Sequence, residues 1–241
     1  MQAGLDIGNT RSKLGLYFGD GTIKMIYLER ESEAIFEAIR KFEIDELIVS
    51  SVSDLMVEDV KLMKTLKTFV SLSHHTPLPI ALEYETPETL GRDRIALAAG
   101  AVALRPGRHQ PYLVIDAGTC IIMDIVDANG AFCGGSICPG MTMRLKAMNT
   151  FTANLPLVSL EDWTQPVGKS TAEALNLGAG LGAISEIEGF YDRMKEDYPG
   201  LNLILTGGDA DFISKKIKRK IFLHPELLHI GLREILRHNA N

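Results

Sequence analysis

The chain has 241 residues, of which 46% are hydrophobic and 23% charged, and its formal net charge is -6. Such a composition is typical of a soluble globular protein, and the length allows one large core or two modest ones. Nucleic acids and anionic membranes usually bind basic faces, so neither is expected as a partner of this acidic chain.

The cysteines and the N-terminus indicate a cytoplasmic protein. Cys120, Cys133 and Cys138 are an odd number and lack a fourth ligand at zinc spacing, so we expect reduced, partly buried thiols. The chain enters an apolar strand at once, without the basic start and apolar stretch of a signal peptide. No apolar run approaches transmembrane length.

The first half of the chain reads as three strands followed by helix–strand units. The expected elements are strands at 2–7, 11–18 and 22–28, a helix at 31–42, a strand at 46–52, a helix at 56–66 and a short strand at 67–72. A helical run from Arg94 then ends at the breakers Arg105-Pro106-Gly107. These breakers predict a lobe boundary between residues 107 and 108.

The second half repeats this order of elements. The expected strands lie at 111–116, 120–126, 131–137, 201–205 and 221–223, and the expected helical segments at 170–198, 209–217 and 225–237. The repetition predicts an α/β protein with duplicated mixed sheets flanked by helices, in lobes 1–107 and 108–241.

Each half also contains the same turn after its first strand. Asp6-Ile7-Gly8-Asn9-Thr10 and Asp116-Ala117-Gly118-Thr119 both follow an apolar run. Glycine lets backbone N–H groups approach an anion, Asn and Thr add donors, and the carboxylate before the turn can hold a metal ion directly or through water. One such turn is common hairpin chemistry. Two in matching contexts indicate a two-lobed phosphotransferase that grips phosphate with both.

A third glycine turn lies between strand 201–205 and the helix that follows it. In Thr206-Gly207-Gly208-Asp209 the glycine pair places N–H groups and a helix start together, which suits the sugar or phosphates of a nucleotide. A plain strand-to-helix turn is the alternative. By contrast, Gly178-Ala179-Gly180-Leu181-Gly182 follows no strand, so close helix packing explains it better than a dinucleotide loop.

Two charged clusters admit a functional and a structural interpretation. In Gly91-Arg92-Asp93-Arg94, at an expected helix start, Asp93 could accept a proton from an attacking hydroxyl while the arginines bind an anion. The alternative is a helix cap with surface salt bridges. The basic run at 215–220 is either a solvated helix end or a contribution to the potential near a nucleotide.

In this order, the motifs resemble those of type III pantothenate kinases, members of the actin/hexokinase/acetate-kinase superfamily. The matching positions extend over nearly the whole chain: 6–13, Tyr84, 91–94, 116–119, 134–140 and Thr206-Gly207-Gly208. The resemblance implies a two-lobed actin-like (ribonuclease H-like) ATPase fold.

The resemblance also implies roles for individual residues. ATP would bind to Asp6, Ile7, Gly8, Asn9, Thr10, Arg11, Ser12, Lys13, Thr119, Gly207 and Gly208. Pantothenate would bind to Tyr84, Gly91, Arg92, Asp93, Arg94 and Thr171, with Asp93 as the catalytic base and Thr171 reaching the substrate from the partner subunit of a homodimer. Asp116 would hold a monovalent cation such as K⁺ or NH₄⁺, and Mg²⁺ bound with ATP would lie near Asp6.

The implied reaction is ATP-dependent phosphorylation of pantothenate to 4′-phosphopantothenate, the first step of coenzyme A biosynthesis. Two alternatives stay open: another kinase of the superfamily acting on a sugar or carboxylate, and a non-catalytic nucleotide-binding regulator. Two positions depart from the family pattern, Arg92 where a small apolar residue is usual and Cys120 where Ala or Thr is commoner. Neither removes a residue to which chemistry is assigned.

Overall fold

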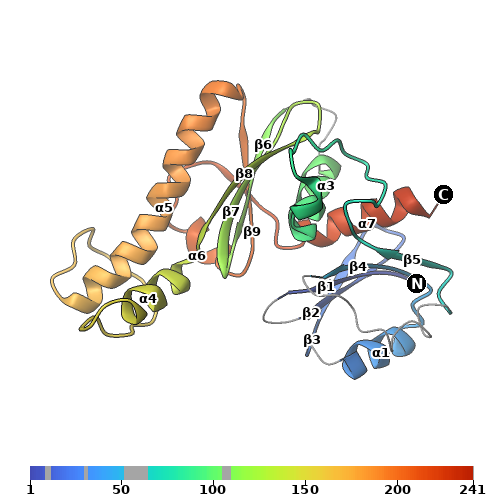
Figure 1. Cartoon of the computed structure of the whole chain (residues 1–241), viewed down its shortest axis with the longest axis horizontal. Coiled ribbons are helices and arrows are strands. Elements are labelled where there is room, and N and C mark those ends of the chain that lie inside the picture. The colour runs from blue at the N-terminus through green and yellow to red at the C-terminus, as the bar shows by residue number, and fades with distance from the viewer. Residues whose placement is uncertain (9–11, 30–31, 52–64, 105–109, 241) are drawn as a thin grey trace. The chain divides into compact units, whose positions relative to one another are not determined.

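The computed structural model describes residues 1–8, 12–29, 32–51, 65–104 and 110–240. The chain forms two compact units, coloured along the sequence in Figure 1. Unit 1 comprises Met1–Arg108, Gly130–Phe132 and Glu226–Asn241, and unit 2 comprises His109–Asn129 and Cys133–Pro225. Within the described ranges, none of the helices combines the length and apolar character needed to cross a membrane.

Unit 1 is built on a five-stranded mixed sheet in the order β3-β2-β1-β4-β5. The strands are β1 (Gln2–Ile7), β2 (Ser12–Tyr17), β3 (Ile23–Leu28), β4 (Glu46–Ser51) and β5 (Thr68–Ser71). β1 pairs antiparallel with β2 and parallel with β4. The central strand β1 therefore carries Asp6 to the edge where β4 also ends, with Asp6 opposite Lys13 on one side and Ser50 on the other.

Helices cover both faces of this sheet. On one face, Ile35 and Ile39 of α1 (Ser32–Lys41) pack with alternate residues of β1, including Leu5. The intervening side of β1 faces α7 (Leu227–Asn239), where Leu232 approaches Gly4. α7 also packs along α3 (Arg92–Ala103), as Figure 1 shows. The alternation of β1 side chains between two helical layers is what buries the strand on both sides.

Unit 2 repeats the sheet of unit 1 strand for strand. Its order is β8-β7-β6-β9-β10, with β6 (Tyr112–Ala117), β7 (Cys120–Val126), β8 (Phe132–Pro139), β9 (Asn202–Thr206) and β10 (Ile221–Leu223). β6 pairs antiparallel with β7 and parallel with β9, as β1 does with β2 and β4. The predicted duplication of mixed sheets is confirmed.

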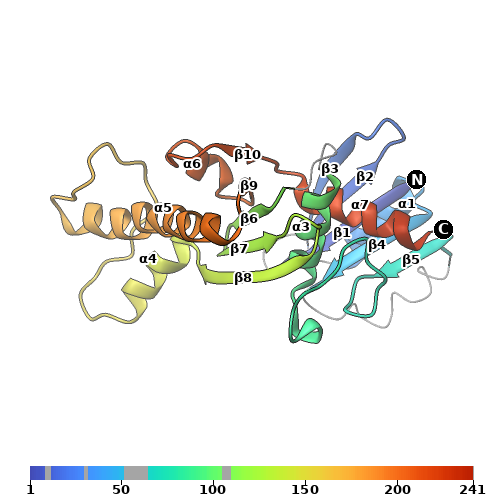
Figure 2. The same ribbon diagram turned by 90° about the horizontal axis from the view of Figure 1, so that it is seen from above.

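The long helix α5 (Thr171–Asp197) supplies much of the packing of unit 2 (Figure 2). Its Ala183, Ile184 and Ile187 lie in the same core cluster as the apolar residues of β6, β7 and β9. Two shorter helices complete the unit, α4 (Met141–Thr150) and α6 (Ala210–Ser214). A single-turn 3-10 helix, η2 (Pro87–Thr89), precedes α3 in unit 1.

Two features differ from the sequence-based expectation. The last helix was expected in the lobe 108–241, but Glu226–Asn241 groups with unit 1 because Leu227, Leu232, Ile235 and Leu236 of α7 are fully buried there. α4 was not expected at all, because only Met141 and Leu145 of its ten residues are buried and no apolar stripe marks it. The expected helix 56–66 lies largely, and the breakers at 105–107 wholly, outside the described residues.

The turn after β6 is held by two other backbone segments of unit 2. The N–H of Asp209 donates to the carbonyl of Ala117 (2.9 Å), and the N–H of Gly140 donates to the carbonyl of Thr119 (3.1 Å). A Cβ atom on Gly140 would lie 2.0 Å from the carbonyl oxygen of Gly118, and one on Gly207 would lie 2.2 Å from that of Ala117. Gly207 also has a positive φ of 99°. Glycine at 140 and 207 is therefore what allows these segments to reach the turn.

Gly207 and Gly208 form a matched pair for testing this packing. We expect Gly207→Ala to lower the free energy of unfolding by about 1–3 kcal/mol or more, because the new side chain clashes with the backbone and the positive φ is unfavourable for alanine. Gly208→Ala should change it by no more than about 0.5 kcal/mol, since apart from its chain neighbours no atom of the described residues lies within 4 Å of the added Cβ. Urea unfolding of both variants checks this. Equal losses would contradict the proposed packing.

A buried histidine lies between α7 and the sheet of unit 1. His229 is 2% exposed, its Nδ1 lies 3.5 Å from the hydroxyl of Tyr17, and its Nε2 has no hydrogen-bond partner in the described part of the chain. Burial, assisted by the positive charge of Lys13, lowers the pKa of His229 to about 3. The imidazole is therefore neutral in the folded protein at neutral pH.

This pKa predicts a stability that falls in acid. The unfolded chain takes up a proton on His229 below its ordinary pKa of 6.5, whereas the folded chain does so only near 3. Above pH 6.5 the titration of His229 leaves the free energy of unfolding unchanged. Below pH 6.5 it lowers the free energy of unfolding by about 1.4 kcal/mol per pH unit as the pH falls toward 3. In urea unfolding between pH 7 and about 4.5, His229→Gln should show a shallower decline than the wild type. Parallel pH profiles would exclude this role for His229.

Candidate active site

In unit 1, the predicted phosphate turn begins at the end of β1. Asp6 is half-buried and Ile7 buried, and Gly8 follows directly. Asn9, Thr10 and Arg11, which the sequence assigned to ATP, lie outside the described residues. After them come the two polar residues that open β2.

Those two residues face different surroundings. Ser12 is fully buried, and its Oγ has no hydrogen-bond partner within the described ranges. Lys13 is half-buried opposite Asp6, and its positive charge helps to lower the pKa of His229 in α7. The pairing of β1 with β2 thus sets an acidic and a basic residue opposite each other at the ends of the strands that flank this turn.

The cluster at 91–94 forms the start of α3, as the sequence predicted. Gly91 is the N-cap, and the Oδ1 of Asp93 accepts a hydrogen bond from the N–H of Arg94 (2.8 Å). A Cβ atom on Gly91 would lie 2.5 Å from that oxygen, so the carboxylate folds back over the glycine. One oxygen of Asp93 is thus fixed by the backbone, which orients the other.

The arginines on either side of Asp93 contact other segments of unit 1. Arg92 donates from Nη1 to the carbonyl of Ser51 at the end of β4 (2.7 Å). Arg94 is 5% exposed, and its guanidinium lies 5.6 Å from the ring centre of Tyr84 and 5.3 Å from that of Phe132. The structure therefore brings Tyr84 and Arg94 together and ties the start of α3 to the carboxyl end of β4. This arrangement differs from the alternative of a solvated helix cap.

In unit 2, Asp116 and Thr119 flank the corresponding turn. Asp116 is half-buried at the end of β6, and its Oδ1 would lie 2.4 Å from a Cβ atom on Gly207. The N–H of Gly118 is used by the carbonyl of Cys120 (2.9 Å), so it is not available to an anion. Thr119 is exposed and makes no hydrogen bond through its own donors within the described residues, although its carbonyl is held by Gly140. Thr119, rather than Gly118, is the donor that this turn presents.

Asp209 is a residue that the sequence argument did not single out. It follows Gly207 and Gly208, and its N–H holds the carbonyl of Ala117. Burial raises the pKa of its half-buried carboxyl group, which has no hydrogen bond or ion pair in the described part of the chain. Only its position after the glycine pair could have drawn attention to it. It is a second acidic residue whose main chain is bonded to the turn.

Thr171 is the first residue of α5 and is exposed, as expected for a helix start. The neighbouring Ser170 is the N-cap, because its Oγ accepts from the N–H of Glu173 (3.2 Å) while the Oε2 of Glu173 accepts from the N–H of Lys169 (2.6 Å). The pair resembles a capping box, except that Glu173 bonds to the residue before the N-cap. Ser170 is therefore occupied in the cap, which leaves Thr171 as the residue that faces outward.

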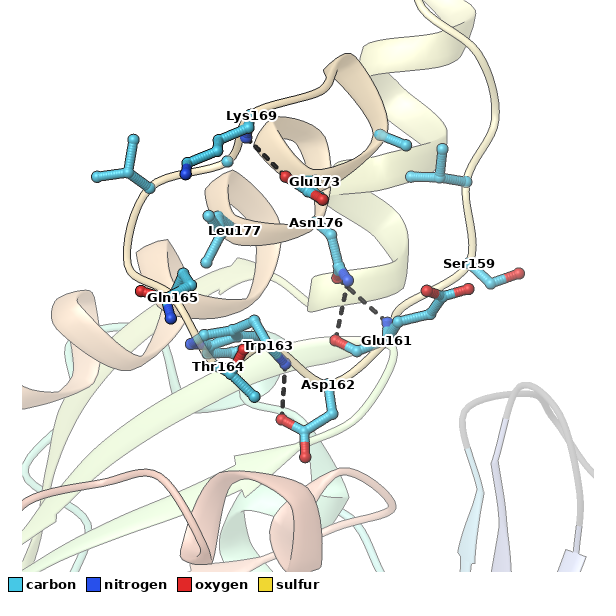
Figure 3. Close-up of a pocket in the computed structure, with 14 residues that line it drawn as sticks. Ser159, Glu161, Asp162, Trp163, Thr164, Gln165, Lys169, Glu173, Asn176 and Leu177 are labelled. Atoms are coloured by element: carbon cyan, nitrogen blue, oxygen red, sulfur yellow. Dashed lines mark hydrogen bonds between the residues drawn. The ribbon is translucent and has the colours of Figure 1, made fainter.

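A cavity of about 680 Å³ lies between the first turns of α5 and the loop at 158–169 (Figure 3). The side chain of Asn176 fixes this loop, bonding to both the N–H and the carbonyl of Glu161 (3.2 and 2.9 Å). Its lining residues all lie between 158 and 177, and none of the described residues predicted to bind ATP or pantothenate is among them.

Trp163 and Gly180 pack against each other in unit 2, as the sequence predicted for the glycine-rich stretch 178–182. A Cβ atom on Gly180 would lie 2.4 Å from the indole ring, so glycine makes room for the tryptophan on α5. Lys216 stacks over the same indole (4.3 Å) and pairs with Asp162. Arg219 of the same basic run pairs with Asp192. These contacts assign part of the basic run to packing and ion pairs within unit 2.

The described residues contain no group of three or more His, Cys, Asp or Glu side chains that could hold a metal ion by themselves. A cation at Asp6 or Asp116 would therefore complete its shell with oxygen atoms of water or of a nucleotide. All three cysteines are half-buried and none is in a disulfide within the described residues.

Matches to type III pantothenate kinases cover most of the chain. A family model for type III pantothenate kinase matches residues 4–193. The type III pantothenate kinase of Bacteroides fragilis (strain ATCC 25285) is 41% identical over 237 residues, which cover 98% of this chain and 97% of that protein. The enzyme of the same name from Cytophaga hutchinsonii is 38% identical over 236 residues, 98% of each chain.

Solved structures with lower identity share the fold. A ROK family glucokinase from Streptomyces griseus, in complex with glucose and AMPPNP, has a TM-score of 0.54 and 13% identity, with 98% of this chain and 99% of that chain covered. Component A of (R)-2-hydroxyglutaryl-CoA dehydratase from Acidaminococcus fermentans has a TM-score of 0.51 and 15% identity, with 99% and 98% covered. The fold is the actin-like ATPase fold, which serves a sugar kinase and a dehydratase component alike.

Because proteins with different activities share this fold, the family assignment comes from the sequence matches. They cover most of the chain and all the motifs described above, apart from the last glycine turn in the case of the family model. The chain belongs to the type III pantothenate kinase family.

Proposed function

We propose that this chain transfers the γ-phosphoryl group of ATP to pantothenate, giving 4′-phosphopantothenate for coenzyme A biosynthesis. The observation that carries the proposal is the 41% identity to a type III pantothenate kinase along nearly the whole chain. The oriented carboxylate of Asp93 at the start of α3 supports it.

The phosphates of ATP are bound by the two duplicated turns. In unit 1 the donors are those of Gly8 to Lys13, and in unit 2 they are the exposed N–H and hydroxyl of Thr119, with Gly207 and Gly208 toward the nucleoside. Phosphoryl transfer demands little covalent chemistry from the protein. Catalysis therefore depends on positioning the phosphates and neutralising their charge.

The carboxylates next to the turns suit cations, because Mg²⁺ and K⁺ prefer oxygen ligands. Asp6 would hold Mg²⁺ of the ATP complex, directly or through water, and Asp116 would hold K⁺ or NH₄⁺. When bound, these ions supply charge neutralisation on the transferring phosphoryl group. Lys13, opposite Asp6, adds a positive charge of the protein itself.

Pantothenate is bound by Tyr84, Gly91 and residues 92–94. Asp93 accepts the proton of the primary hydroxyl as that oxygen attacks the γ-phosphorus, and the bond from the γ-phosphorus to the bridging oxygen breaks to release ADP. The N–H of Arg94 donates to one oxygen of Asp93, which leaves the other oxygen to accept the proton of the hydroxyl. Arg92 holds the start of α3 against β4 and thereby steadies Asp93.

A homodimer completes the site in this proposal. Thr171, exposed at the start of α5, then reaches the pantothenate bound by the partner subunit. The reaction takes place in the cytoplasm, where ATP is abundant and the free cysteines stay reduced.

The substrate is tested by incubating the purified protein with Mg²⁺-ATP, K⁺ and either pantothenate, a panel of sugars or acetate. Formation of 4′-phosphopantothenate and ADP in equal amounts, with no phosphorylated sugar or acetate, supports the proposal. Phosphorylation of a sugar or acetate instead indicates another kinase of the superfamily. ATP binding without any product indicates a nucleotide-binding regulator.

Asp93 is tested by the variant Asp93→Asn, which keeps the size of the side chain but cannot accept the proton. We expect turnover to fall by roughly 10²- to 10⁴-fold, the usual effect of removing a general base. Binding of ATP should change little. Kinetics with pantothenate and calorimetric titration with an ATP analogue measure the two quantities on a variant shown to be folded. Near-normal turnover would rule out the base, and loss of ATP affinity would assign Asp93 to the nucleotide or the fold.

The cation requirement is tested by replacing K⁺ and NH₄⁺ with Na⁺ and Tris. We expect turnover to fall and to recover on addition of KCl, because Asp116 lies beside the turn where phosphate charge accumulates. Asp116→Asn should weaken the response to K⁺. Undiminished turnover without K⁺ or NH₄⁺ would remove the cation from the mechanism.

A further inference from the structure

Arg144 and Glu186 form an ion pair close to the phosphate turn of unit 2. Arg144 lies in the first turn of α4 and Glu186 in the middle of α5. The Nη2 of Arg144 donates to the Oε2 of Glu186, and the Nε of Arg144 donates to the carbonyl of Pro139 (2.9 Å). The guanidinium thus connects a helix of the core to the segment between β8 and α4.

That segment is also bonded to the turn. The peptide unit between Pro139 and Gly140 is held at both ends, because its oxygen accepts from Arg144 and its N–H donates to the carbonyl of Thr119. Gly140 is packed so closely on Gly118 that a Cβ atom would not fit between them. A change in the orientation of this peptide would therefore move the Thr119 carbonyl and, with it, the donors of Thr119.

The anchor on α5 is itself rigid. Ala183 and Ile187, on either side of Glu186 along the helix, are fully buried in the core of unit 2. Burial alone would raise the pKa of Glu186, but hydrogen bonds from the Cys138 thiol and Arg144, together with the charge of Arg144, lower it overall. Burial and the Glu186 carboxylate raise the pKa of Cys138, so the thiol keeps its proton and can donate.

We infer that Arg144 and Glu186 are positioning residues that fix the Gly118-Thr119 turn for phosphate binding. Their value for overall stability is small, because partly exposed ion pairs contribute about 0–1 kcal/mol. Their effect on the turn is larger, because misplacing a phosphate donor by about 1 Å can cost about 10²-fold in rate. The inference rests on the proposed function, in which Thr119 binds phosphate.

The experiment compares Arg144→Ala, Arg144→Lys and Glu186→Gln with the control Arg219→Ala. The control breaks another arginine–carboxylate pair to α5, between Arg219 and Asp192, which is not hydrogen-bonded to the turn. For each variant, the measurements are the Kd of a non-hydrolysable ATP analogue without pantothenate, kcat, KM for pantothenate and Tm.

We expect Arg144→Ala to raise the Kd of the ATP analogue and to lower kcat, and the two fold-changes multiplied together should be about 10- to 100-fold. The KM for pantothenate should be nearly unchanged. Arg144→Lys should lie between, because an ammonium cannot reproduce both bonds of the planar fork. Glu186→Gln should share the direction of the effect, and Arg144→Ala/Glu186→Gln should be no worse than Arg144→Ala if the pair acts as a unit. Arg219→Ala should lower Tm at most, with normal nucleotide binding and turnover.

The inference is overturned if Arg144→Ala and Arg219→Ala give the same nucleotide affinity and turnover, or if the kinetic loss merely follows Tm. Glu186→Gln decides the question in the same way if Arg144→Ala does not fold. A wild type that binds the analogue but makes no 4′-phosphopantothenate overturns the proposed function alone, because the effect on Kd still tests Arg144.

Discussion

Close contact between backbones at the end of β6 is the constraint on which the site in unit 2 depends. The turn at 116–119 meets Gly140 on one side and the Gly207-to-Asp209 segment on the other, and neither glycine has room for a Cβ atom. Two hydrogen bonds between main-chain groups join them, from Asp209 to Ala117 and from Gly140 to Thr119. The turn can therefore keep its position only if the segments that touch it are themselves fixed, by β9 and α6 on one side and by β8 and α4 on the other.

The duplicated sheet explains why this constraint arises at this place. In each unit the central strand, β1 or β6, pairs antiparallel with the strand that follows it and parallel with β4 or β9. The acidic residue at the end of the central strand, Asp6 or Asp116, therefore lies beside the end of the parallel strand. Unit 1 uses that edge to bring Asp6 near Ser50 and the start of α3. Unit 2 uses it to bring Asp116 to Gly207. Under the proposed function, the turns of both units bind the phosphates of ATP, and unit 1 also binds pantothenate at the start of α3.

Strong local patterns made most of this predictable. The strands of both sheets alternate or run apolar between turn residues, and the duplicated Asp-x-Gly turn identified the repeat without any long-range information. Three features were not predictable because they depend on tertiary contacts. α4 has too few buried residues to show a period, α7 packs with α3 rather than with its neighbours in sequence, and the bonds from Arg144 to Glu186 and Pro139 join residues whose spacing has no signature. The use of the Gly118 N–H within the turn also required the structure.

The central claim is that the turn of unit 2 receives the phosphates while the start of α3 receives the acceptor. Backbone hydrogen exchange, measured first with Mg²⁺-ATP alone and then with pantothenate added, tests it most directly. ATP alone should slow exchange at 116–120 and 206–209, because bound phosphates would protect the donors of Thr119 and the glycine pair. Pantothenate should add protection at Tyr84 and 91–94. Unchanged exchange at 116–120 and 206–209 under saturating ATP would contradict the account.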